Sequence, residues 1–168
     1  MKGAPIDNAK TGAIQFVKSM KPRDELVVIN FNQAVSVLAE FGSIQQNGEA
    51  SINRIQGIFV DGGTALHDSI RESYEMLKKL KKAKPERRYS ILPLSDGRDT
   101  SSKMNRHDLI DYLPAGEDPD IPKIFAIAYG DEADKELLAE IAKRTNGRLF
   151  ISSPEEIVKT YKELSANF

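Results

Sequence analysis

The sequence predicts an α/β fold with a doubly wound, mostly parallel sheet that carries helices on both sides. Short apolar runs alternate along the chain with longer segments whose apolar residues recur at three-four spacing. This alternation is typical of parallel strands joined by crossover helices. The runs at 26–31 and 124–129 are apolar almost throughout, which is expected for strands covered on both faces.

One edge of this sheet is predicted to be antiparallel. Only Asn32 and Gln33 separate the run at 26–31 from an alternating segment at 34–41. Parallel neighbours need a crossover of a dozen residues or more, so a two-residue link predicts a hairpin. We therefore expect 34–41 to be an antiparallel edge strand.

The remaining elements follow in order within one expected domain, residues 1–168. The first is a helix at 5–20, where Pro5 suits the first turn and Pro22 ends the pattern. Further helices are predicted at 48–58, 65–83, 104–113, 133–145 and 154–165, and further strands at 89–94 and 149–151. Gly147 is the expected cap of the helix before it. A doubly wound sheet normally begins with a strand at its centre, and here the chain opens with a helix.

Composition excludes several classes of protein. Lys plus Arg is 24 against 25 for Asp plus Glu, which argues against a dedicated nucleic-acid binder. The chain has no cysteine, so disulfides, thiolate metal sites and cysteine nucleophiles are excluded. No apolar run approaches the roughly 20 residues that span a bilayer. The start of the sequence does not resemble a signal peptide, and the localisation stays open.

Two loops are the candidates for chemistry. In a doubly wound sheet, ligands bind at the carboxyl ends of the strands. Asp61-Gly62-Gly63-Thr64 precedes the long helix, and Ser95-Asp96-Gly97 ends a strand. A hydroxyl and a carboxylate at one crevice would offer the oxygen ligands that Mg²⁺ or Mn²⁺ prefer. The alternative is that Gly-Gly-Thr is an ordinary turn and helix cap.

The order of these motifs resembles the von Willebrand factor type A domain, and bacterial members in particular. The matching stretches cover nearly the whole chain: Lys2-Gly3, Phe31-Asn32, Gly62-Gly63-Thr64-Ala65-Leu66, Leu94-Ser95-Asp96-Gly97 with Asp99-Thr100, Ala128-Tyr129-Gly130, and Leu138 to Gly147. The resemblance implies a metal-ion-dependent adhesion site for Mg²⁺ or Mn²⁺, with Thr64 and Asp96 at two of its ligand positions. It also suggests a parent protein of the cell envelope or a secreted one.

The sequence departs from the family at its start. The family's D-x-S-x-S metal loop follows the first strand, and Met1-Lys2-Gly3 resembles the residues just after that loop. We therefore expect a domain that lacks the central first strand and the main metal ligands, and that binds Mg²⁺ weakly or not at all. Pro93 supports an edge position for its strand, because proline is normally confined to edges; the alternative is that it lies at a bulge.

Three functions from different classes are considered. The first is a protein-interaction module, in which an acidic side chain of the partner completes the metal site. The second is a metal-independent scaffold. The third is an enzyme, because residues 61–69 resemble the loop of haloacid dehalogenase-type phosphatases, although Gly63 stands where that chemistry needs a second aspartate. We expect an interaction module and no enzyme, no direct insertion into a membrane, and an edge-paired or strand-swapped dimer.

The other polar residues have simpler interpretations. His67 and His107 are expected to be ordinary polar residues on helices or at the surface, not metal ligands. Asp99 is expected to cap the following turn, with a supporting role for Asp61 or Asp99 at the metal site as the alternative. The basic residues at 78–88 are interpreted as a solvated helix end.

Overall fold

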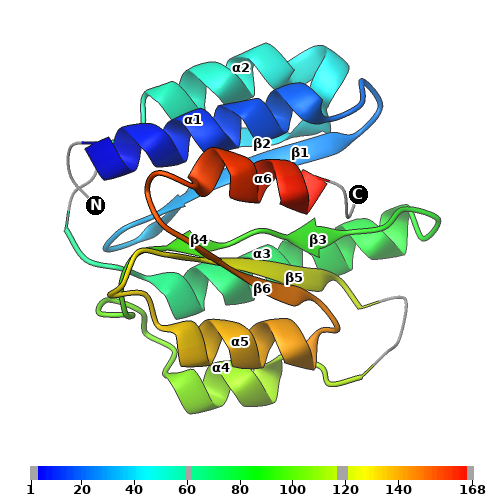
Figure 1. Cartoon of the computed structure of the whole chain (residues 1–168). Coiled ribbons are helices and arrows are strands. Elements are labelled where there is room, and N and C mark those ends of the chain that lie inside the picture. The colour runs from blue at the N-terminus through cyan, green and yellow to red at the C-terminus, as the bar shows by residue number, and fades with distance from the viewer. Residues whose placement is uncertain (1–3, 60–61, 117–120, 166–168) are drawn as a thin grey trace.

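Helices cover both faces of a central layer of strands in the computed structural model of the chain (Figure 1). The structure describes residues 4–59, 62–116 and 121–165. Three helices lie on one face: α1 (Ala4–Ser19), α2 (Ile44–Gln56) and α6 (Ile157–Ser165). The opposite face carries α3 (Leu66–Ala83), α4 (Arg106–Tyr112) and α5 (Lys135–Arg144). The predicted α/β class, with helices on both sides of a parallel sheet, is confirmed.

The strands of the described chain form two separate sheets. An antiparallel pair joins β1 (Glu25–Phe31) to β2 (Val35–Ser43). In the second sheet, β5 (Lys123–Tyr129) lies between β6 (Arg148–Ser152) on one side and, on the other, β3 (Ser90–Ile91) and β4 (Leu94–Ser95). All pairs of this second sheet are parallel.

Strand β5 is the centre of the packing, because its side chains alternate between the two helical layers. Ile124, Ala126 and Ala128 belong to a core shared with α3, α4 and α5. Phe125, Ile127 and Tyr129 belong to a second core, shared with α1, β6 and α6. A strand with both faces buried needs apolar residues at every position, which is why 124–129 has no polar residue.

Strand β1 forms the predicted hairpin but is less buried than its sequence predicts. Its register with β2 is antiparallel, from Glu25 opposite Ser43 to Phe31 opposite Val35, as the two-residue link predicts. All seven residues of β1 are only half-buried, whereas the apolar run predicts a strand covered on both faces. The reason is that no described strand pairs with the other edge of β1, which borders an open cleft.

The predicted strand at 89–94 is interrupted at Pro93. The structure has two short pieces, β3 and β4, separated by Leu92 and Pro93. The Pro93 carbonyl accepts a hydrogen bond from the amide of Ile127 on β5, over 2.8 Å. The N–H and C=O of one strand residue point to the same side, so the proline lacks a donor on the side of β5. Among the described strands, β3 and β4 pair only with β5, so this strand has the expected edge position. The proline itself interrupts the paired side, which agrees with the alternative of a local irregularity.

Several boundaries differ from the sequence prediction. Helix α2 begins at Ile44, four residues before the predicted start at 48. The first amides of α2 donate to carbonyls of the loop between α1 and β1. The amide of Ile44 donates to the carbonyl of Asp24, and that of Gln45 donates to the carbonyl of Pro22. These contacts satisfy helix donors that no nearby side chain caps.

Among the described residues, no helix is both long and apolar enough to cross a membrane.

Candidate functional site

The two candidate loops lie at the same end of the strands and are bonded to each other. The amide of Thr64 donates to Thr100 Oγ1 over 2.9 Å. In return, the Thr64 carbonyl accepts from the amides of Thr100 and Ser101, at 2.9 and 3.2 Å. The next residue, Ala65, donates its amide to the carbonyl of Asn32 over 2.6 Å. The loop before α3 is thus fixed to the end of β1 and to the loop after β4.

Two glycines allow this close approach. Gly62 has φ +72°, in the left-handed region that glycine adopts without strain. A Cβ atom on Gly63 would overlap Ser101 Oγ and would lie 2.9 Å from Thr100 Oγ1. The Gly-Gly-Thr sequence is therefore required by the contact between the two loops. The residue that caps α3 is Ala65, and no side chain caps this helix, so the prediction that the motif is a helix cap is wrong and the Thr64 hydroxyl stays available.

The metal candidates Thr64 and Asp96 both line one large cavity, of about 1120 Å³. The Thr64 hydroxyl makes no hydrogen bond to another described residue, and its side chain is half-buried. Asp96 also borders a smaller hollow of about 200 Å³, together with Tyr129, Asp131 and Glu132. Burial raises the pKa of the Tyr129 phenol, and the negative charges of Glu155 and Asp96 raise it further. This end of the sheet is consequently acidic.

These residues do not make a complete metal site. Within the described part of the chain, no three histidine, aspartate or glutamate side chains are grouped so that they could hold an ion. Mg²⁺ demands near-octahedral oxygen coordination and gives up its water reluctantly. One hydroxyl and one carboxylate fall short of that requirement. Two parts of the predicted site lie outside the described residues. They are Asp61 and the stretch Met1-Lys2-Gly3, which resembles the residues after the metal loop.

Asp99 has a structural role that the sequence indicates only in part. Its carboxylate accepts from the amide of Ser102 (3.1 Å) and from Ser102 Oγ (2.6 Å), as the cap of the following turn. It also accepts from the amide of His67, over 2.9 Å, at the start of α3. Burial acts to raise the pKa of Asp99, but the hydrogen bonds from Ser102 and His67 outweigh it and lower the pKa. The carboxylate is therefore held in its charged form between two loops.

A carboxylate of α3 bonds to the same loop in the opposite direction. Asp68 accepts hydrogen bonds from the amides of Lys103 and Met104, at 2.8 and 3.1 Å. His67 is buried, and its Nδ1 lies 2.9 Å from the carbonyl of Met104. In the tautomer that carries the proton on Nδ1, the ring donates to this carbonyl. His67 is thus a bonded polar residue of α3, and the segment 99–104 is anchored to the helix by His67 and Asp68.

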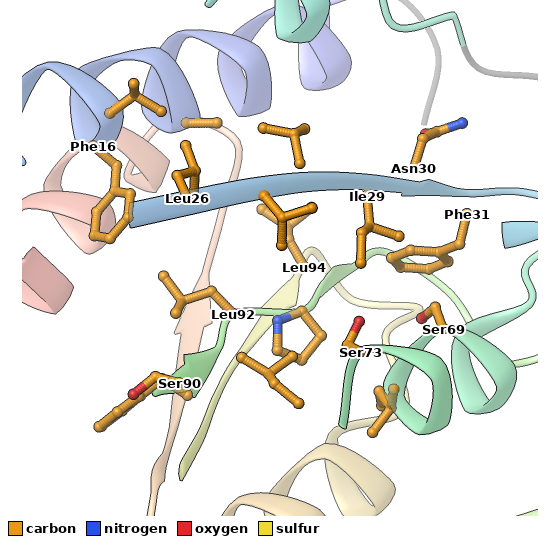
Figure 2. Close-up of a pocket in the computed structure, with 18 of the residues that line it drawn as sticks. Phe16, Leu26, Ile29, Asn30, Phe31, Ser69, Ser73, Ser90, Leu92 and Leu94 are labelled. Atoms are coloured by element: carbon orange, nitrogen blue, oxygen red, sulfur yellow. The ribbon is translucent and has the colours of Figure 1, made fainter. Parts of the chain in front are cut away.

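The cavity is a cleft between the two sheets (Figure 2). Its walls are β1 on one side and the segment from Ser90 to Asp96 on the other. Helix α1 contributes Phe16, and α3 contributes Ser69 and Ser73. No local pattern in the sequence predicts this cleft, because it depends on which strands pair.

Comparisons with known proteins agree with this architecture. A family model described as "von Willebrand factor type A domain" matches residues 1–163. A von Willebrand factor type A protein from Catenulispora acidiphila superposes with a TM-score of 0.79 at 16% identity, over 96% of this chain and 37% of that one. No curated protein sequence matches.

Two further solved structures are similar in fold. Proximal thread matrix protein 1 from the mussel byssus, whose structure has a zinc-occupied MIDAS motif, gives a TM-score of 0.74 at 17% identity, over 96% of this chain and 42% of that one. A paralog of ArnB from Sulfolobus acidocaldarius gives 0.70 at 21% identity, over 94% and 39%. The chain therefore spans about two fifths of the length of these proteins.

Proposed function

Because the chain belongs to the von Willebrand factor type A family, we propose that it is a protein-interaction module that binds its partner where the loops at 62–64 and 96–101 meet. The observation that supports this proposal is that these two loops are hydrogen-bonded to each other and both line a large cleft. Rigid loops with an available hydroxyl and a carboxylate form a surface suited to recognition. The partner is a protein.

In this proposal the metal site is incomplete, so that the chain alone does not depend on a bound ion. The family resemblance implies that an ion would lie next to Thr64 and Asp96. The mussel protein, which is similar in fold, has a zinc-occupied MIDAS motif. Their two oxygen ligands provide too little charge for tight binding of Mg²⁺ or Mn²⁺. An acidic side chain of the partner would add one ligand more. Metal-dependent recognition thus needs further oxygens from outside the described residues.

Calorimetric titration of the chain with Mg²⁺ and Mn²⁺ tests this part of the proposal. We expect half-saturation at millimolar concentration or no heat at all, because of the sparse ligand set. The same titration on Asp96→Asn and Thr64→Val should differ little from the wild type. Asp131→Asn, at an exposed carboxylate near the same end, is the matched control. Micromolar binding that disappears in Asp96→Asn, and not in the control, would show that the site is complete.

The enzyme alternative is tested separately. A haloacid dehalogenase-type phosphatase would hydrolyse p-nitrophenyl phosphate in the presence of Mg²⁺. We propose that the chain has no such activity, since Gly63 occupies the position of the acid/base aspartate in that chemistry. Turnover that is present in the wild type and lost in Asp61→Asn would favour the enzyme over the interaction module.

A further inference from the structure

Strand β6 forms the outer edge of the parallel sheet. Among the described strands it pairs only with β5, and helices α5 and α6 lie on its opposite faces (Figure 1). An unpaired edge exposes N–H and C=O groups that can bond to another strand. Strand β5 lies between β6 and the pieces β3 and β4, so this edge faces away from the cleft.

The direction of the backbone groups shows which residues of β6 can bond outward. The carbonyl of Ser152 accepts from the amide of Gly130, at the end of β5, over 2.8 Å. The N–H and C=O of one strand residue point to the same side, and this side alternates along the strand. Phe150 therefore also bonds toward β5, whereas Leu149 and Ile151 turn their backbone groups outward. The free groups lie symmetrically about Phe150.

The side chains along this edge are apolar on the face that carries α5. Ile151 is 64% exposed, and Leu149 is half-buried against the core beneath α5. Phe150 points to the opposite face and is buried in the core shared with α1 and α6. A strand paired with this edge would lie beside Ile151 and Leu149 and cover the exposed part of both, because cross-strand neighbours on one face are in contact.

The edge of β6 lacks the features that usually keep a strand edge unpaired. Natural sheets protect their edges with bulges, prolines or charged side chains. The other outer strand, β2, has such features, since its register with β1 shifts twice and Glu40 is exposed on it. The register of β6 with β5 is continuous, β6 contains no proline, and Ile151 is exposed where a charged residue would protect the edge.

The two ends of β6 carry opposite charge. At its start, Lys123 of β5 and Arg148 are exposed. Beyond its end, Glu155 and Glu156 are exposed just before α6. Thr160 of α6 donates to Ser152 Oγ or accepts from it over 2.9 Å, which fixes the beginning of α6 at the end of β6.

The charged groups at these two ends are free to pair. The Arg148 guanidinium lies 5.0 Å from the centre of the Phe150 ring. Neither Arg148 nor Glu156 forms an ion pair with another residue that the structure describes. A strand that runs antiparallel to β6 and has the same charges would therefore place basic residues opposite acidic ones at both ends.

We propose that the partner of this edge is a second copy of the chain, bound by antiparallel pairing of β6 with β6 around a two-fold axis at Phe150. Leu149 of one copy then exchanges backbone hydrogen bonds with Ile151 of the other, and the reverse pair forms on the opposite side of the axis. Arg148 of each copy faces the acidic end of the other, next to Glu156. A parallel arrangement would put like charges side by side. The dimer joins the two parallel sheets into one continuous sheet.

Sedimentation of the chain over a range of concentrations, with EDTA present, tests the proposal without any role for metal. We expect a monomer–dimer equilibrium with a dissociation constant of roughly tens of micromolar, because small interfaces are weak. Amide exchange of Leu149 and Ile151 should slow at least tenfold between dilute and concentrated protein. The amides of Phe150 and Ser152 should change little, since they already bond toward β5.

Two lysine substitutions identify the edge that pairs. Ile151→Lys places a charge on the exposed side of β6 and should leave the chain monomeric. Val37→Lys is the matched control, since Val37 is 49% exposed on β2, at the other end of the strand layer. It should dimerise like the wild type. Both side chains are exposed, so both variants should keep the amide spectrum of the folded chain.

A charge exchange tests the pairing of Arg148 with Glu156. Arg148→Glu and Glu156→Arg should each weaken the dimer at least tenfold, because each variant places like charges opposite one another. An equimolar mixture of the two variants should dimerise again as a mixed pair, since every contact at the two ends then joins opposite charges. Mixing would not rescue a variant whose defect lies in its own folding.

Three results would overturn the proposal. The first is a monomer at the highest concentration reached by a chain with a folded spectrum. The second is a dimer that survives Ile151→Lys, whether or not Val37→Lys abolishes it, because its interface then lies elsewhere. The third is a dimer in which the amides of Leu149 and Ile151 exchange as fast as in the monomer.

Discussion

At the scale of single residues, Asp99 is the group whose chemistry most directly controls the loops of the site. Replacing it with asparagine removes the charge that accepts hydrogen bonds from Ser102 and His67. Hydrogen bonds to a charged group contribute about 1.5 to 3 kcal/mol, so Asp99→Asn should lower the free energy of unfolding by about 2 kcal/mol at pH 7. Urea unfolding measures this loss.

The pH dependence of the same variant has a defined sign. The folded-state pKa of Asp99 lies below its ordinary value of 3.8. Its contribution to stability is therefore complete above that ordinary value and disappears as the pH falls through the lowered one. The stability difference between the wild type and Asp99→Asn should shrink between pH 5 and pH 2. Asp131→Asn, at a fully exposed carboxylate, should show no comparable change, and a difference independent of pH would contradict the assignment.

Gly63 carries a second prediction at this scale. An alanine at this position would place Cβ against Ser101 Oγ, and overpacking of this kind costs about 1 to 3 kcal/mol. Removing the opposing hydroxyl should relieve part of the clash. We expect Gly63→Ala to lower stability, and Ser101→Ala in the same chain to restore part of the loss. The double-mutant cycle measures this coupling; additive effects would mean that the two loops are not in contact.

At the scale of elements, the junction between α5 and β6 shows how one contact fixes a boundary. Gly147 is the cap that the sequence predicts, but the residue with positive φ is Asn146, at 52°. The amide of Gly147 donates to the carbonyl of Ala142, and a Cβ atom on Gly147 would overlap the backbone of Ile124. Glycine is thus required for close packing against β5 and not for its conformation.

This distinction predicts opposite outcomes for two substitutions. Gly147→Ala should destabilise the chain by about 3 kcal/mol, because backbone atoms of Ile124 cannot rotate away. Asn146→Gly should be neutral or slightly stabilising, because glycine adopts the left-handed conformation without strain. Thermal unfolding of both variants measures the effect. A larger loss for Asn146→Gly than for Gly147→Ala would reverse the assignment.

Element order could be predicted from the sequence because the signals are local. Periodicity identifies α3 and β5, and the two-residue link at Asn32-Gln33 identifies the hairpin. The start of α2 could not be predicted, since its first amides bond to the carbonyls of Pro22 and Asp24 in a preceding loop. Pairing with β5 determines to which side the backbone groups of Pro93 point. No local sequence pattern predicts this direction.

The placement of the two candidate loops at one end of the sheet could be predicted from the sequence. The hydrogen bonds that join them could not. The rule that ligands bind at the carboxyl ends of strands brings Thr64 and Asp96 to one cavity, and the structure has both on its wall. The capping of α3 by Asp99, across 32 residues, is a long-range contact that spacing does not indicate. His67 was expected among surface or helix polar residues, and its burial follows from the same long-range contact.

At the scale of the whole molecule, the two sheets differ in how fully their strands are paired and buried. Strand β5 is paired on both sides and buried in two cores, whereas β1 is paired on one side and half-buried throughout. A two-stranded sheet is marginal unless other elements support it, and here the support comes from α2 and α3. We therefore expect the molecule to open first along the cleft, with β1 and β2 separating from the rest.

Native-state hydrogen exchange measures this order of opening. In low denaturant, amides of β1 that bond to β2 should exchange with a free energy of opening at least about 2 kcal/mol below that of Ala126 and Ile127 in β5, because regions with fewer buried contacts open locally. Equal values for β1 and β5 in the free chain would mean that the cleft edges are held together in solution, by direct pairing or by a second copy.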